Sequence, residues 1–334
     1  MKALAAVLLL CIATTGTASP ADVESVESIA IPVSDMARAT EFYTHVLAFK
    51  IVDDHEVFGS SYEHFFGVFG TRLHVMRLRL GDEAVELLQF LAPRGRPLPI
   101  DLRANDRAFQ HIAIIVSDMD RAYAWLRRNG VEHASTGPQV LPASNPNAGG
   151  IAAFYFRDPE GNFLEILHFP PGKGAPRWQS KSDLFLGIDH TAIVVADTEE
   201  SLHYYRDLLG LSVAGVSANY GTEQEHLNNV FGAHLRITSL RAAHGPGVEL
   251  LEYLTPRTGR PIPPDSQASD RWYWQINFQA AQPESIYARA ADRHAQFVSN
   301  GVVPLETPAL GFTRGFVARD PDGHAAAITA AAAP

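Results

Sequence analysis

The chain contains 334 residues, of which 46% are hydrophobic, so it is long enough for two ordinary domains and too apolar for intrinsic disorder. Its 27 Lys and Arg residues stand against 37 Asp and Glu residues, and the formal net charge is -10. Because no block of basic residues is present, we expect no nucleic-acid partner. The single cysteine, Cys11, excludes a disulfide framework and a thiolate metal cluster.

The first 21 residues have the order of a secretory signal peptide. Lys2 supplies a positive start, residues 3–14 form an apolar run, and small residues follow at positions 16–18. The run is too short for a stable transmembrane helix, and no later segment has about 18 uninterrupted apolar residues. We therefore expect cleavage after Ala18 or Ala21, a periplasmic or secreted mature protein, and no membrane association after cleavage.

The two halves of the chain repeat one another. The segment Val85–Leu88 recurs as Val248–Leu251, with the same letters. The segment Gly95–Pro99 is followed by an Asp-Arg pair, and so is its second copy, Gly259–Pro263. Matches of this kind indicate a duplicated architecture.

A shorter unit recurs within each half. It starts with a β-branched run that is typical of a strand, and the run ends at an aspartate where a helix N-cap is expected, namely Asp35, Asp118 or Asp197. Apolar residues at helical spacing follow. A later apolar strand carries Glu86, Glu165 or Glu249. The unit is therefore predicted as a strand, a helix and a few further strands.

One such unit cannot cover both faces of its small sheet, so two must pack together. We place four modules at residues 25–95, 108–170, 186–256 and 273–330. Pairing of sequence neighbours would give two domains, 25–170 and 186–330, joined by a linker at 171–185. Residues 93–106 and 256–270 would connect the modules within each domain.

The tandem arrangement resembles the vicinal oxygen chelate superfamily, which includes glyoxalase I, extradiol dioxygenases and bleomycin- and fosfomycin-resistance proteins. The most specific motif is DPEGNFLEI at residues 158–166, with a partial copy, DPDGH, at 320–324. The resemblance implies an α+β fold in which four βαβββ modules pair into two glyoxalase/dioxygenase-type domains. It also implies a divalent metal ion on the floor of a cup, held by the first and last strands of two modules.

The family's ligand positions fall on two residues of each module. In chain order they are Ser28 and Glu86, His111 and Glu165, His190 and Glu249, and Gln275 and Ala327. With neighbour pairing, the first cup would hold a metal on Glu86, His111 and Glu165, with Ser28 or water in the fourth place. The second cup would be degenerate. One imidazole and two carboxylates suit Fe, Mn, Zn, Ni or Co.

A different pairing would join the two middle modules. It would unite His111, Glu165, His190 and Glu249 in a set that resembles the ligands of glyoxalase I. Glu86 lies among leucines, where a buried carboxylate requires a partner, and an arginine could serve as well as a metal.

Two further features have two interpretations each. Arg96 and Arg260 in the repeated segments would clamp an anionic substrate or, as we expect, tie a connection to its own domain. Residues 145–150 form a turn-rich loop that is either a plain connection or a cover over the cup.

The resemblance implies a metal-dependent lyase or isomerase acting on a small substrate with vicinal oxygens, with Glu86 or Glu165 as general base. Two alternatives stay open: an extradiol-type dioxygenase, and a resistance-type protein that binds a small molecule without turnover. A homodimer is also left open. No nucleotide-binding motif is present in the sequence.

Overall fold

The computed structural model describes residues 22–305 and 309–332. The segment predicted as a signal peptide, residues 1–21, lies outside the described residues. No helix in the described ranges is long and apolar enough to cross a membrane.

The described chain contains four modules, each made of strands and short helices. The first comprises β1 (Ser25–Pro32), α1 (Met36–Glu41), β2 (Lys50–Phe58), α2 (Ser60–Phe66), β3 (Arg72–Leu80) and β4 (Glu83–Ala92), with a π-helical turn at Phe42–Val46 after α1. The second comprises β5 (Phe109–Val116), α3 (Met119–Arg128), β6 (Glu132–His133), β7 (Gln139–Val140), β8 (Ala152–Arg157) and β9 (Phe163–His168), and a 3-10 turn follows at Pro176–Gln179.

The third module comprises β10 (Phe185–Val195), α4 (Thr198–Tyr205), β11 (Ser212–Tyr220), α5 (Thr222–Asn228), β12 (His234–Arg241) and β13 (Gly247–Thr255). The fourth comprises β14 (Gln275–Gln279), α6 (Pro283–Asp292), β15 (Gln296–Phe297), β16 (Val303–Pro304), β17 (Phe312–Arg319) and β18 (Ala325–Ala331). The predicted α+β class and the four modules are confirmed.

The three predicted helix N-caps are present. Each aspartate side chain accepts a hydrogen bond from a backbone N–H in the first turn of its helix: Asp35 from Arg38 at 3.1 Å, Asp118 from Arg121 at 2.9 Å and Asp197 from Glu199 at 2.8 Å. These bonds satisfy amide groups that have no partner inside the helix. The caps fix where each helix leaves its first strand.

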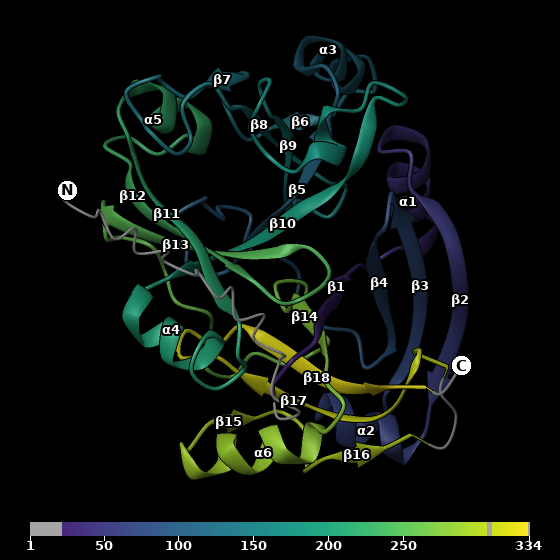
Figure 1. Cartoon of the computed structure of the whole chain (residues 1–334). Helices are drawn as coiled ribbons and strands as arrows, with labels where there is room; N and C mark the ends of the chain where they lie inside the picture. Colours follow the sequence, from purple (N-terminus) through teal and green to yellow (C-terminus); the bar gives the residue numbers. More distant parts are fainter. Residues whose placement is uncertain (1–21, 306–308, 333–334) are drawn as a thin grey trace, which may run out of the picture.

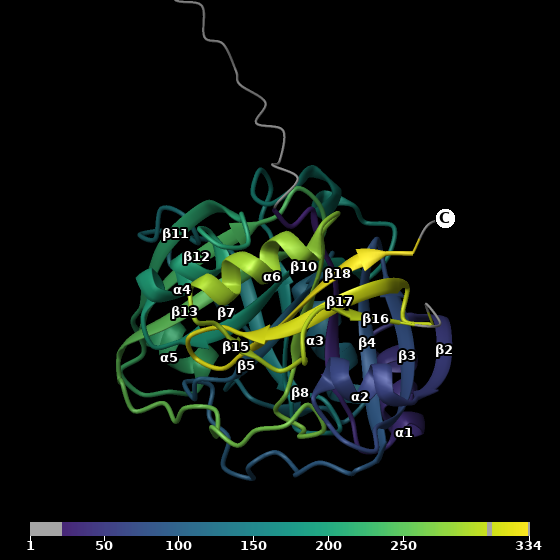
Figure 2. The ribbon, with the colours of Figure 1, turned by 90° about the horizontal axis from the view of Figure 1, so that it is seen from below.

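The modules pair differently from the expected arrangement of sequence neighbours. Sheet A has the order β15-β17-β18-β14-β1-β4-β3-β2, with β16 paired to β17, and sheet B has the order β11-β12-β13-β10-β5-β9-β8-β6, with β7 paired to β8. The first module thus joins the last, through antiparallel β1 and β14, and the two middle modules join through antiparallel β5 and β10. Figures 1 and 2 show the strands of the first module beside those of the last module.

The prediction that residues 25–170 and 186–330 form separate cups is therefore wrong. Each half of the chain contributes one module to sheet A and one to sheet B, because the connections 93–106 and 256–270 cross between the sheets. A single buried cluster contains Ile29, Ile112 and Ile276, from strands of both sheets. The two sheets thus share a hydrophobic core on one face, and the opposite face of each lines a cup.

The two crossing connections are tied to each other. The Arg96 guanidinium lies 2.7 Å from the Asp270 carboxylate, and that of Arg260 lies 2.6 Å from Asp106. A side chain at Gly95 would place its Cβ 1.8 Å from the Ser269 carbonyl oxygen, so the backbones approach too closely for any other residue. These arginines hold the two halves of the chain together, whereas we expected each to tie a connection to its own domain.

We expect Asp106→Ala to destabilise the fold by about 2 kcal/mol, because it leaves Arg260 without the buried member of its ion pair. Arg260 donates hydrogen bonds to both Asp106 and Asp101, and the Asp101 side chain is 71% exposed. Asp101→Ala is therefore the matched control and should change stability little. Chemical denaturation measures both, and equal losses would contradict the assignment.

The Asp106 ion pair also has a defined pH dependence. Burial raises the pKa of Asp106, but hydrogen bonds from Arg260 and backbone N–H groups outweigh it and hold the pKa below its usual value. The difference in the free energy of unfolding between wild type and Asp106→Ala should therefore have its full value above about pH 4. It should decrease as the pH falls further.

Candidate metal centre

Four adjacent strands of sheet B bring four candidate ligands to one face. His111 lies on β5 and is paired in register with Ala192 of β10, two residues beyond His190. Glu165 on β9 pairs with Ala113 of β5, and Glu249 on β13 pairs with Ala192. Because side chains alternate along a strand, these positions all point into the cup.

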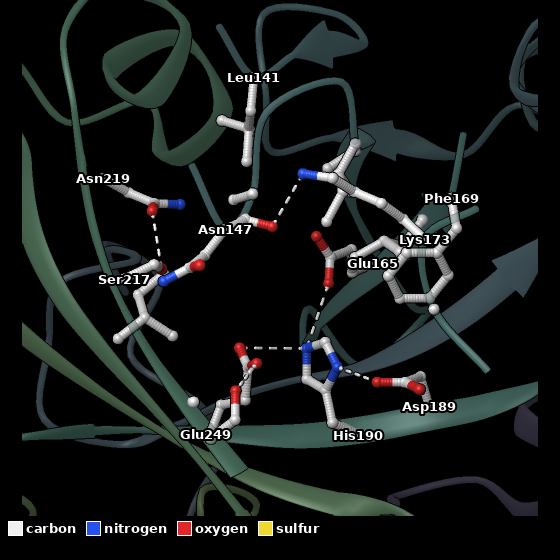
Figure 3. A pocket seen from close by; sticks show the side chains of 18 of the residues that line it. Leu141, Asn147, Glu165, Phe169, Lys173, Asp189, His190, Ser217, Asn219 and Glu249 are labelled. Atoms are coloured by element: carbon white, nitrogen blue, oxygen red, sulfur yellow. Dashed lines mark hydrogen bonds and ion pairs between the residues drawn. The ribbon is translucent and has the colours of Figure 1, made fainter. Parts of the chain in front are cut away.

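The four side chains converge closely. Glu165 Oε2 lies 3.1 Å from His111 Nε2 and 3.7 Å from His190 Nε2. Glu249 Oε2 lies 3.4 Å from His190 Nε2, and the two imidazole Nε2 atoms are 3.4 Å apart. The ligand atoms of His111, Glu165 and His190 all lie within 4.8 Å of one another, and the three residues are buried. Figure 3 shows His190 between the two carboxylates.

Each imidazole is oriented by the residue that precedes it. Asp189 Oδ2 lies 3.0 Å from His190 Nδ1, and Gln110 Oε1 contacts His111 Nδ1. Arg241 donates to Asp189 at 2.9 Å and fixes that carboxylate in turn. Acceptors on both Nδ1 atoms hold a proton at each Nδ1 and turn each Nε2 into the cup, the usual outer arrangement of a metal-bound histidine.

The site concentrates negative charge around His190. Burial alone would lower the pKa of His190, but the carboxylates of Glu249, Asp189 and Glu165 together raise it to about 9. The cup therefore favours a positive charge at this position.

The centre lies on the wall of a cavity of about 690 Å³ in cup B, the cup of sheet B. Tyr155 lies against His111, with ring centroids 4.9 Å apart, and burial raises the pKa of its hydroxyl well above the usual value. The loop at 145–150 reaches β11, where Asn147 donates to the Val216 carbonyl at 2.6 Å. Lys173 donates to the Asn147 carbonyl at 3.0 Å (Figure 3). This loop lines the cavity, which agrees with its interpretation as a cover over the cup.

Cup A, the cup of sheet A, holds the remaining candidates and lacks this convergence. Glu86 accepts hydrogen bonds from Ser28 Oγ at 2.9 Å, from Arg77 at 2.8 Å and from Asn277 at 3.1 Å. Gln275 and Ala327 lie on β14 and β18 of the same sheet. The predicted grouping of Glu86 and Ser28 with His111 and Glu165 is therefore wrong, because the two pairs lie in different sheets. The alternative with paired middle modules gives the observed set.

The residue opposite the carboxylate on the neighbouring strand differs between the two cups. Arg77 lies opposite Glu86 in sheet A, and Ser239 lies opposite Glu249 in sheet B. The Arg77 guanidinium pairs with Glu86 and also with Glu27, whereas the Ser239 hydroxyl donates to Glu249 at 2.5 Å and brings no positive charge. Only the carboxylate of cup B is thus available to a cation.

Sequence reasoning missed Arg77, although a signal for it exists. The Gly81-Asp82 turn pairs Leu80 with Glu83, and this register sets Arg77 opposite Glu86. Asp189 and Gln110 were also missed, and their signal is a hydrogen-bonding side chain directly before each strand histidine.

Paired βαβββ modules with a buried His and Glu cluster on the cup wall define the class of protein. Residues 25–166 and 187–328 match the family model of the Glyoxalase/Bleomycin resistance protein/Dioxygenase superfamily. The chain belongs to this superfamily, and the resemblance stated above is confirmed.

Two curated relatives carry enzyme names. The chain is 33% identical over 165 residues to a 2-epi-5-epi-valiolone epimerase from Actinomyces sp, covering 47% of this chain and 86% of that protein. It is 25% identical over 190 residues to a lactoylglutathione lyase from Schizosaccharomyces pombe, covering 55% of this chain and 58% of that protein. The chain thus spans less than two thirds of the second relative.

Solved structures show the same fold at low identity. Glyoxalase I from Zea mays matches with a TM-score of 0.58 and 14% identity over 92% of both chains. A putative dioxygenase from Bacillus subtilis matches with a TM-score of 0.57 and 16% identity, covering 93% of this chain and 86% of that chain. These solved structures show the fold of the chain.

Proposed function

We propose that the chain is a metal-dependent lyase or isomerase that acts on a small substrate with two vicinal oxygens. One observation carries the proposal. The Nε2 atoms of His111 and His190 face each other at 3.4 Å while both Nδ1 atoms are committed to Gln110 and Asp189. Two imidazole Nε2 atoms that face each other beside two carboxylates form a donor set suited to a cation.

The donor set fits a divalent ion. His111, Glu165, His190 and Glu249 would hold it, and two imidazoles with two carboxylates suit Fe, Mn, Zn, Ni or Co. When bound, such an ion polarises a carbonyl oxygen and stabilises the anion formed beside it. The cavity gives a substrate access to the open positions.

The carboxylates differ in their suitability as general base. The Glu165 side chain is 4% exposed and contacts both imidazoles, whereas that of Glu249 is 19% exposed and contacts one imidazole, that of His190. Glu249 therefore faces the cavity and is the better placed to take a proton from the carbon beside the substrate carbonyl. Glu86, which the sequence offered for this role, lies in cup A. Tyr155 stays protonated and can donate a hydrogen bond to a substrate oxygen.

The same site supports a second candidate function. His111, His190 and Glu165 form the two-histidine, one-carboxylate set that non-haem Fe(II) oxygenases use. An extradiol dioxygenase would therefore be the alternative, since the second histidine it needs comes from the neighbouring middle module.

The test is exchange of the proton beside a carbonyl. We expect the protein, stripped with EDTA and reloaded with one metal at a time, to exchange the α-proton of an α-hydroxyketone with deuterium by NMR. Glu249→Gln should slow exchange about 100-fold or more at a metal concentration that saturates the variant. Glu86→Gln is the matched control and should leave exchange unchanged. Oxygen consumption with a catechol and Fe(II), without exchange, would favour the dioxygenase instead.

A further inference from the structure

Helix α5 carries two buried amide side chains beside the candidate metal centre. Gln224 and Asn228 are 2% and 3% exposed, and Gln224 Nε2 donates to Asn228 Oδ1. The other two atoms, Gln224 Oε1 and Asn228 Nδ2, have no hydrogen-bond partner within the described ranges. Leaving a buried acceptor and a buried donor unpaired costs stability, so the pair calls for an explanation.

The equivalent helix of cup A shows that the fold does not need these amides. Helix α2 follows Gly59 and ends at the left-handed Gly67, as α5 follows Gly221 and ends at the left-handed Asn229. At the positions of Gln224 and Asn228, α2 has Tyr62 and Phe66, which pack in the apolar cluster of cup A. The amides therefore occur in the cup with the metal-ligand cluster, and apolar rings occupy the same places in the other cup.

One member of the amide pair borders the cavity that a bound molecule would occupy. Gln224 lines the same cavity as His111, Glu165, His190 and Glu249. The unpaired acceptor of this residue, Gln224 Oε1, can take a hydrogen bond from a hydroxyl group.

The cationic side chains of the cavity are committed to other partners, which disfavours a dicarboxylate. Arg177 lies 2.6 Å from the buried carboxylate of Glu83, and Arg241 lies 2.9 Å from Asp189, so neither guanidinium is available to an anion without losing its partner. Lys173 donates to a backbone carbonyl of the cavity loop. The cavity thus offers no pair of uncommitted cations for a dicarboxylate.

We propose that the substrate of this site is an uncharged, hydroxyl-rich carbonyl compound, and that Gln224 binds a hydroxyl beyond the two oxygens at the metal. The inference rests on the proposed function. It names Gln224 as a specificity-determining residue.

The test compares ligands that share the chelating oxygens. Calorimetry on the Mn²⁺-loaded protein would use a set of inososes of different configuration, 2-hydroxycyclohexanone, which lacks the additional hydroxyls, and the anion S-D-lactoylglutathione. We expect at least one inosose to bind about ten-fold more tightly than 2-hydroxycyclohexanone. S-D-lactoylglutathione should bind more weakly than that inosose.

Substitution of the amide separates recognition from folding. In Gln224→Leu, the ratio of the affinity for the inosose to that for 2-hydroxycyclohexanone should fall to about one. The melting temperature should stay at or above that of the wild type. His226→Gln, an exposed position on the same helix, is the control and should keep the preference. The inference would be overturned if the wild type bound every inosose no more tightly than 2-hydroxycyclohexanone, or if it bound S-D-lactoylglutathione more tightly than the inososes. An unchanged preference for the inosose in Gln224→Leu would also overturn it. Metal content is measured in the same samples, so failure of the metal site itself is recognised separately.

Discussion

Glu165→Gln should abolish tight metal binding. Glu165 is the carboxylate that reaches both His111 and His190, at 3.1 and 3.7 Å. The amide keeps the size of the side chain and removes its charge, so two imidazoles and one carboxylate remain for the ion. We expect at least about a 100-fold loss of affinity, since even outer partners of a metal site contribute 10- to 100-fold. Elemental analysis and competition with a chromogenic chelator measure it.

The repeated architecture supplies the control. Glu86 is the cup A carboxylate that corresponds to Glu249, and Arg77 lies 2.8 Å from it, outside the candidate centre. Glu86→Gln should therefore leave the metal content at about one ion per chain. Loss of the ion in Glu86→Gln, with retention in Glu165→Gln, would show that the site assignment is wrong.

Much of the fold is present in local sequence patterns. Asp35, Asp118 and Asp197 mark three helix starts because an aspartate before an apolar helical stretch caps the free amide groups. The duplicated segments give four modules, since each repeat forms one supersecondary unit. His111, Glu165, His190 and Glu249 follow from their equivalent positions in these units.

The pairing of modules is not present in local patterns. The strands at the centres of both sheets, β1, β5, β10 and β14, are all mostly buried, so hydrophobicity alone allows any two of them to join. Contacts far apart in the chain decide the choice, such as Arg96 with Asp270. Because the histidines of the site come from β5 and β10, an error in pairing becomes an error in the ligand set.

The same pairing makes the two halves of the chain dependent on each other. The first half supplies His111 and Glu165 to the candidate centre, and the second half supplies His190 and Glu249. Residues 22–181 alone would also lack β14 and β10, which leaves β1 and β5 as open edges of two half-sheets. We expect neither this fragment nor residues 182–334 to bind metal or to unfold cooperatively by itself.

Co-expression of the two fragments should restore a 1:1 complex with about one metal ion, because the Arg96 and Arg260 ion pairs and both central strand pairs re-form without a covalent link. Light scattering with elemental analysis measures the stoichiometry. A fragment 22–181 that is monomeric, unfolds cooperatively and binds metal would instead show that neighbouring modules can form a complete cup. The expected result tests the fold directly. Only the pairing of the first module with the last, and of the two middle modules, leaves each half of the chain incomplete in both sheets.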